Sequence, residues 1–147
     1  MRYLGLDVGD SRIGVARSDE TATLASGLDT IRRVGPRKDV KAVAALVRAN
    51  EVAEVVVGLP RRLDGEIGPQ AQKVLAFMDD LRAAVRVPVT PWDERFTTAE
   101  ANRVLIEGDV SREGRRAAVD KVSAILILQS YLDSRKLQDA AAGSPPP

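Results

Sequence analysis

The chain has 147 residues, of which 44% are hydrophobic and 29% are charged, and its formal net charge is +1. This size and balance are typical of one soluble globular domain, and an anionic partner would have to be met by a local cluster of arginines and lysines. The sequence contains neither cysteine nor histidine, which excludes disulfides, thiolate nucleophiles, cysteine zinc sites and histidine bases.

The same composition limits the chemistry and the location of the protein. An enzyme without these residues must rely on carboxylates, lysine, arginine, serine, threonine and hard cations. No apolar run reaches the roughly 18 residues that a bilayer requires, and the first residues lack a signal-peptide pattern. We therefore expect a cytoplasmic protein that does not contact a membrane.

The first fifteen residues predict a β-hairpin. Residues 3–8 form a short apolar run that suits a buried strand, except for the carboxylate of Asp7. The sequence Gly9-Asp10-Ser11 is typical of a tight turn, and residues 12–16 alternate as a second antiparallel strand would. A carboxylate in a buried strand costs several kcal/mol unless it is paired or binds a cation, so Asp7 needs an explanation.

Helices and strands alternate after this hairpin. Pro36 suits a first helical turn, and the continuous apolar run VAEVVVGL favours a strand covered on both faces. Prolines in the strand after the second helix argue against a central place in the sheet. The predicted elements are a strand over 22–32, a helix from 36 to about 50, a strand over 52–59, a helix over 71–85 and a strand over 87–92.

The last third predicts two helices joined by a basic loop. A helix begins at Thr97 or Thr98, residues 108–116 form a mobile basic loop, and the most apolar helix covers 117–137. The tail over 138–147 is expected to be disordered. The order of elements predicts an α/β fold with a mixed five-stranded sheet flanked by helices, in a single domain over 1–137.

Three carboxylates carry the functional hypothesis. Asp7 and Glu94 lie at the ends of predicted strands, and Asp120 lies early in the most apolar helix. Each also has a structural explanation of its own: Asp7 could form an Asx-turn, Glu94 could pair with Arg95, and Asp120 could be a favourable charge at a helix N-terminus. Together at one sheet edge they would repel one another, and divalent cations would relieve that repulsion. Asp93 is a reserve candidate for the same site.

Basic residues flank these positions and could position phosphates, although each could also belong to a solvated charged face. The candidates for nucleic-acid binding are Arg12, Arg61, Arg62, Arg95, Thr97, Thr98, Arg112, Arg115, Arg116 and Lys121.

Four motifs in register resemble one known family. They are LGLDVGDSRIGVA, VVVGLPRRLDGEIGPQA, DERFTTAEA and VDKVSAILIL, and they span about residues 2–135. Together they are similar to the YqgF (RuvX-like) family. That resemblance implies a ribonuclease H-like fold. It also implies an activity described either as Holliday junction resolution or as maturation of the 5′ end of pre-16S rRNA.

The resemblance also implies roles for particular residues. Asp7, Glu94 and Asp120 would form the acidic metal-binding triad, and the Gly58-Leu59-Pro60 segment with Thr97 and Thr98 would line the site. The first turn departs from the family, because Ser11 stands where a basic residue is expected, which leaves the contribution of that position open.

The leading hypothesis is a nuclease that uses Mg²⁺ or Mn²⁺, with two ions, on structured RNA or branched DNA. A nucleotide-hydrolysing relative of actin-like ATPases and sugar kinases is a second reading, since the first turn also resembles their phosphate loop. A third is a nucleic-acid-binding assembly factor without turnover. The protein could be a monomer or a homodimer, because the apolar last helix and Trp92 suit either a core or an interface.

Overall fold

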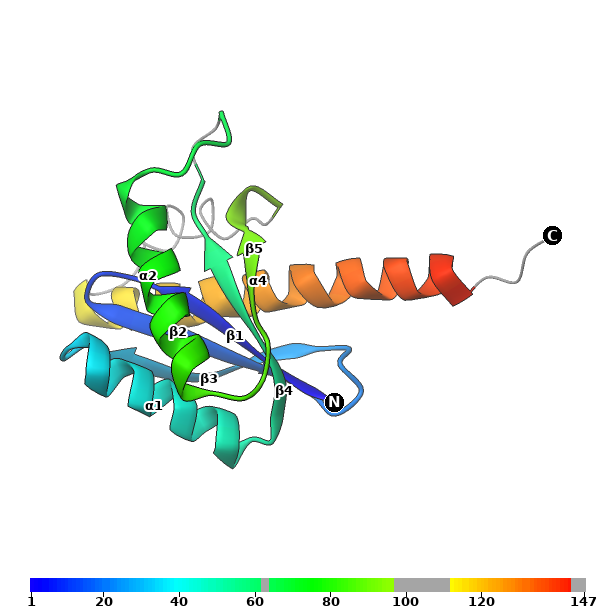
Figure 1. The fold of residues 1–147 in the computed structure, drawn as a ribbon, viewed down its shortest axis with the longest axis horizontal. Helices are drawn as coiled ribbons and strands as arrows, with labels where there is room; N and C mark the ends of the chain where they lie inside the picture. Colours follow the sequence, from blue (N-terminus) through cyan, green and yellow to red (C-terminus); the bar gives the residue numbers. More distant parts are fainter. Residues whose placement is uncertain (62–63, 97–111, 144–147) are drawn as a thin grey trace.

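The computed structural model describes the backbone of residues 1–61, 64–96 and 112–143, and the side chains of residues 1–61, 64–95 and 121–139. Within that part of the chain, three hairpin-connected strands are followed by alternating helices and strands and by one long closing helix (Figure 1). The elements are β1 (Arg2–Val8), β2 (Arg12–Ser18), β3 (Ala25–Arg32), α1 (Pro36–Ala49), β4 (Val52–Leu59), α2 (Pro69–Ala84), β5 (Val89–Asp93), the 3₁₀ turn η1 (Glu94–Phe96) and α4 (Arg112–Gly143).

The five strands form one sheet in the order β3-β2-β1-β4-β5. The hairpin strands β1, β2 and β3 pair antiparallel, whereas β4 and β5 run parallel to β1. The predicted mixed sheet is therefore confirmed, and the proline-containing β5 is an edge strand, as expected. The parallel strands β1, β4 and β5 end at the same edge of the sheet, where ligands commonly bind in such folds.

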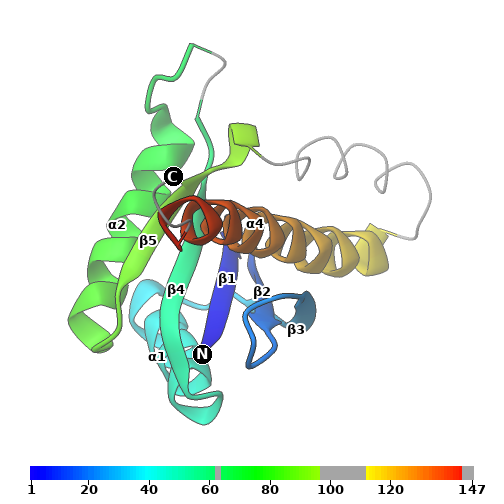
Figure 2. The same cartoon turned by 90° about the vertical axis from the view of Figure 1, so that its right-hand side faces the viewer.

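Helices cover both faces of the sheet (Figure 2). One core lies under α1 and α2 and contains Leu4, Leu6 and Val57, while the other lies under α4 and contains Tyr3 and Val56. Because neighbouring residues of a strand point to opposite faces, the odd-numbered residues of β1 face α4, as do Val56 and Gly58 of β4. None of the described helices is long and apolar enough to cross a membrane.

Glycines let α4 approach the sheet closely. A Cβ atom built on Gly5 of β1 would lie 2.6 Å from the Leu128 Cβ, and one on Gly58 of β4 would lie 2.4 Å from the Ile127 Cδ1. At the β3 edge, the aliphatic part of Lys121 occupies the space above Gly27. The helix therefore crosses the sheet from β3 to β4 with little side-chain material between them.

Two C-terminal predictions are wrong, because α4 is longer at both ends than expected. Residues 112–116, predicted as part of a mobile basic loop, are the first turns of α4, and residues 138–143, predicted as disordered, are its last turns. Arginine, glutamate and alanine are strong helix formers, so a helix established over the apolar segment extends into its polar flanks. The predicted helix starting at Thr97 or Thr98 and the predicted loop residues 108–111 lie outside the described residues.

Trp92 belongs to the core under α4. Its indole Nε1 donates a hydrogen bond to the Ser130 Oγ at 3.1 Å, and its ring meets the Tyr131 ring edge-on at 5.4 Å between centroids. This packing accounts for Trp92 within one protomer, so it does not call for a dimer interface.

A buried ion pair fixes the hairpin turn that follows β1. The Arg33 Nε donates to the Asp39 Oδ2 at 3.0 Å, the Arg33 Nη1 donates to the carbonyl of Gly9 at 3.0 Å, and the guanidinium lies over the Phe77 ring. The Asp39 carboxylate is 1% exposed and also accepts from the Val34 amide at 3.0 Å. Burial favours the neutral acid, but these hydrogen bonds prevail and lower the pKa of Asp39 below 3.8.

We expect Asp39→Asn to destabilise the protein by about 2 kcal/mol at pH 7, because Arg33 loses a charged partner in a buried place. A lowered native pKa gives stability that is present above the unfolded pKa and is lost as the pH falls through the native pKa. The difference in the free energy of unfolding between wild type and variant should therefore be smaller below about pH 4 than at pH 7. Urea denaturation at pH 7 and below pH 4 measures this difference, with the exposed Asp79→Asn as control. A difference that does not depend on pH would contradict the lowered pKa of Asp39.

Candidate active site

Asp7 is a buried carboxylate near the carboxyl end of β1, the central strand. Its side chain is 5% exposed and, as an odd-numbered residue of β1, it faces α4. Its partner on β2 is Gly14, and on β4 the pairing of Leu6 with Val57 brings Gly58 to the next position. Glycine on both neighbouring strands leaves room around this carboxylate.

Glu94 reaches the same side of the sheet from the end of β5. It is 6% exposed, and its Oε1 would lie 3.0 Å from a Cβ atom at Gly58. The carboxylate therefore lies over β4, under α4. Asp7 belongs to β1 and the Glu94 carboxylate lies over β4, so these two buried carboxylates lie on the same face of the sheet over neighbouring strands, which are about 4.8 Å apart.

The third predicted carboxylate, Asp120, lies on α4, and its side chain falls outside the described residues. Its backbone position is one helical turn before Ala124, whose carbonyl oxygen approaches Gly5 of β1. The long helix thus carries residue 120 across the same face of the sheet that holds Asp7 and Glu94.

The donor set fits a hard divalent cation. Carboxylate oxygens are the ligands that Mg²⁺ and Mn²⁺ prefer, and the missing side chain at Gly58 lets the Glu94 carboxylate lie directly over β4. Among the described side chains, no group of three acidic residues could by itself hold a metal ion. Of the three predicted ligands, the described side chains include Asp7 and Glu94.

Asp93, the reserve candidate, forms ion pairs with two arginines. The Arg95 Nε donates to both carboxylate oxygens at 3.2 and 3.0 Å, and the Arg95 Nη2 donates to Oδ2 at 2.7 Å. The Arg61 Nε lies 3.7 Å from the same Oδ2. The hydrogen bonds from Arg95 lower the pKa of Asp93, although burial opposes them, and Asp93 in turn raises the pKa of Arg95.

The other predicted nucleic-acid-binding residues are distributed along the α4 side and the loop edge. Arg12 begins β2, beside the turn after Asp7, whereas Lys121 lies across the outer strand β3. Arg112, Arg115 and Arg116 lie in the first turns of α4, with side chains outside the described residues. Arg62, Thr97 and Thr98 are themselves outside the described residues.

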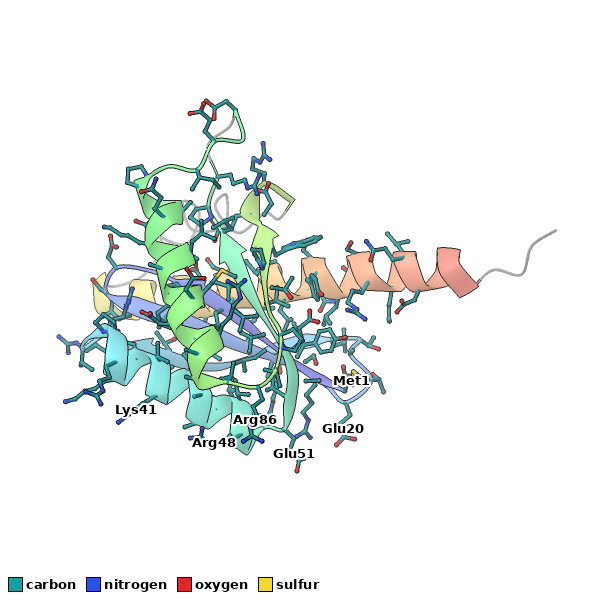
Figure 3. All side chains as sticks on the ribbon, viewed as in Figure 1. Met1, Glu20, Lys41, Arg48, Glu51 and Arg86 are labelled. Atoms are coloured by element: carbon teal, nitrogen blue, oxygen red, sulfur yellow. The ribbon has the colours of Figure 1, made fainter. Side chains whose placement is uncertain are left out.

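A cavity of about 330 Å³ lies at the opposite end of the sheet. It is lined by apolar residues from α1, α2 and the start of β4, with Arg48, Glu51 and Arg86 also contributing. Figure 3 shows these three charged residues near the ends of α1 and α2, away from the loop that follows β4. The hollow is therefore separate from the buried carboxylates.

Comparison with known proteins identifies the family. Residues 1–134 match the family model described as "RuvX: Holliday junction resolvase". The chain belongs to the RuvX family. A relative from Caldanaerobacter subterraneus subsp. tengcongensis is 55% identical over 92% of this chain and 99% of its own length. Another from Thermoanaerobacter pseudethanolicus is 50% identical over the same shares, and both carry the name "Putative pre-16S rRNA nuclease".

Solved structures confirm the ribonuclease H-like fold that the resemblance implied. RuvC of T. thermophilus, solved with a Holliday junction substrate, aligns with a TM-score of 0.64 at 14% identity, covering 92% of this chain and 96% of RuvC. The fowlpox virus Holliday junction resolvase aligns with a TM-score of 0.52 at 15% identity, covering 91% of this chain and 99% of the resolvase. At these identities the likeness concerns the fold.

Two features of the site were missed from the sequence. The first is the position of the Glu94 carboxylate above Gly58, because the face of β4 on which it lies depends on the packing of α4. The other is the partnership of Asp93 with Arg61 and Arg95. The two-residue spacing of Asp93 and Arg95 is a signal for their ion pair in the sequence. The approach of Arg61 has no such signal, because it depends on how β4 and β5 pair.

We expect Gly58→Ala to destabilise the protein by about 1–3 kcal/mol, because its Cβ would overlap the Ile127 Cδ1 and press on Glu94. Adding Ile127→Val removes that Cδ1, so the double variant should recover most of the lost stability while the crowding at Glu94 remains. Urea denaturation of the three proteins measures this. Equal stability of Gly58→Ala and wild type would show that α4 does not pack as described.

Proposed function

We propose that this protein is a divalent-metal-dependent nuclease that hydrolyses phosphodiester bonds in pre-16S rRNA, at its 5′ end. The observation that carries the proposal is the gathering of Asp7 and Glu94, both buried, over adjacent strands at one sheet edge. Burying two acidic groups near one another costs free energy through desolvation and repulsion, and a bound divalent cation would offset that cost. The names of the RuvX relatives support the substrate class.

Asp7, Glu94 and Asp120 would hold Mg²⁺ or Mn²⁺, which when bound supply an activated water and stabilise charge on the phosphate. The residues of the chain do the rest. The cores on both faces of the sheet fix the two strand-borne carboxylates and exclude bulk water behind them. Lys121 and Arg95 would offset the negative charge that develops on the phosphoryl oxygens.

The basic residues along the loop edge would bind the nucleic-acid backbone. Arg12, Arg61 and Arg95 lie beside the ends of β1, β4 and β5, so they would contact phosphates on either side of the cleaved bond. We further propose that the protein acts in the cytoplasm.

Resolution of Holliday junctions is the second candidate, and the description of the family model favours it. A resolvase makes two paired cuts and needs two active sites, which one protomer does not supply. Oligomeric state therefore separates the two functions: a monomer that cleaves RNA supports rRNA processing, whereas a dimer that cuts junctions symmetrically supports resolution.

We expect Asp7→Asn and Glu94→Gln to lower the rate of cleavage at least ~100-fold, because each removes a charge that holds the cations. Labelled pre-16S leader RNA, single-stranded DNA and a four-way junction should each be incubated with Mn²⁺, Mg²⁺ or chelator. Binding of RNA in chelator should persist in both variants, and the exposed Glu20→Gln should cleave as wild type does.

Two results would contradict this proposal. Full cleavage by Asp7→Asn would remove the carboxylates from the mechanism. Binding without cleavage by the wild type, under every metal condition, would favour an assembly factor without turnover.

A further inference from the structure

Asp93 joins two segments that border the candidate site. It ends β5 in register with Leu59, the last residue of the parallel β4, so the loop after β4 begins beside it. This pairing brings Arg61 of that loop to the Asp93 carboxylate, which is 11% exposed. Arg95 approaches from the other direction, through η1. One partly buried carboxylate thus contacts two arginines from different elements.

The two guanidinium groups remain partly open to solvent. The side chain of Arg61 is 38% exposed and that of Arg95 is 35% exposed. Arg95 uses Nε and Nη2 for Asp93, while its Nη1 lies 3.2 Å from the place of a Cβ on Gly65, in the loop after β4. Asp93 and Gly65 therefore limit the movement of the Arg95 guanidinium without covering it.

Asp93 also shapes the backbone at Glu94. Its Oδ1 accepts a hydrogen bond from the Arg95 backbone amide at 2.9 Å, which closes an Asx-turn around Glu94. The carboxylate thus makes two separable contributions, one to the turn and one to the arginines.

We propose that Asp93 is a positioning residue that holds Arg61 and Arg95 as a paired phosphate-binding site for the nucleic-acid backbone next to the cleaved bond. This inference rests on the proposed function. A planar guanidinium binds phosphate with defined geometry, and fixing two of them in advance lowers the entropic cost of binding. Asp93 therefore acts through the arginines rather than as a ligand of the cations.

Charge alone predicts the opposite effect of removing Asp93. The substrate is a polyanion, so loss of a negative charge at its binding surface would tighten binding if the arginines needed no anchor. If Asp93 positions them, its loss weakens binding although the net charge becomes more positive. The sign of the change separates the two explanations.

The test is Asp93→Asn. Its amide oxygen can still accept from the Arg95 backbone, but its amide nitrogen cannot accept from the guanidinium. We expect affinity for leader RNA, measured in chelator at 0.15 M salt, to fall ~10-fold, and kcat/KM to fall ~10–100-fold. The Mn²⁺ concentration for half-maximal cleavage should stay as in wild type. Asp79→Asn, which breaks an exposed Asp–Arg pair on α2, is the matched control.

Arginine-to-lysine changes measure the coupling directly. Arg95→Lys keeps the charge and loses the forked geometry, so it should weaken RNA binding ~10-fold in the wild-type background and less than ~2-fold in Asp93→Asn. Arg61→Lys should show the same pattern. These variants also decide the question if thermal melting shows that Asp93→Asn does not fold, because wild-type affinity in both would overturn the proposal.

Unchanged or tighter RNA binding by folded Asp93→Asn would overturn the positioning role. A rise of more than ~10-fold in the Mn²⁺ requirement would also overturn it and make Asp93 a ligand of the cations. Absence of cleavage by the wild type would instead refute the proposed function, while the affinities in chelator would still decide the role of Asp93.

Discussion

The close contact between α4 and the sheet is the constraint on which the rest of the structure depends. Gly5 and Gly58 provide no side chain where Leu128 and Ile127 cross β1 and β4, so the helix lies directly on the strands. That contact determines how near residue 120 comes to the strand ends and how much space Glu94 has over β4. A bulkier residue at either glycine would lift the helix and separate the elements that carry the three acidic residues.

The edge of the sheet is shaped by polar contacts as well as by packing. Arg33 and Asp39 hold the turn after β1 against α1, so the hairpin that presents Asp7 is fixed on the face opposite α4. At the end of β5, Asp93 holds the arginines that border Glu94. Asp7 and Glu94 thus each have an ion pair nearby that orders their surroundings.

The sequence predicted much of the fold because the period of apolar residues is strong in most elements. The run VAEVVVGL marked β4 with the bounds that the structure shows, and the prolines placed β5 at an edge. The predicted start of α4 was wrong because Gly114 and the charged residues near it interrupt the apolar pattern. The helix nevertheless extends into this segment by propagation from the residues that follow it.

The site was predicted less completely than the fold. Asp7 could be predicted because a carboxylate that interrupts an apolar strand is visible in the sequence alone. The role of Asp93 could not be, because its contact with Arg61 joins residues more than thirty positions apart through the pairing of β4 with β5. Contacts of this kind depend on strand order, which local patterns do not contain.

The last turns of α4 extend past the sheet (Figure 1), and Leu137 is 73% exposed there. This overhang contributes little to either core, yet it is continuous with the helix that bears residue 120. A spectroscopic label on it would report the orientation of α4 from outside the proposed substrate-binding edge. Distances from such a label to a labelled RNA would therefore locate the bound strand without altering the residues that hold it.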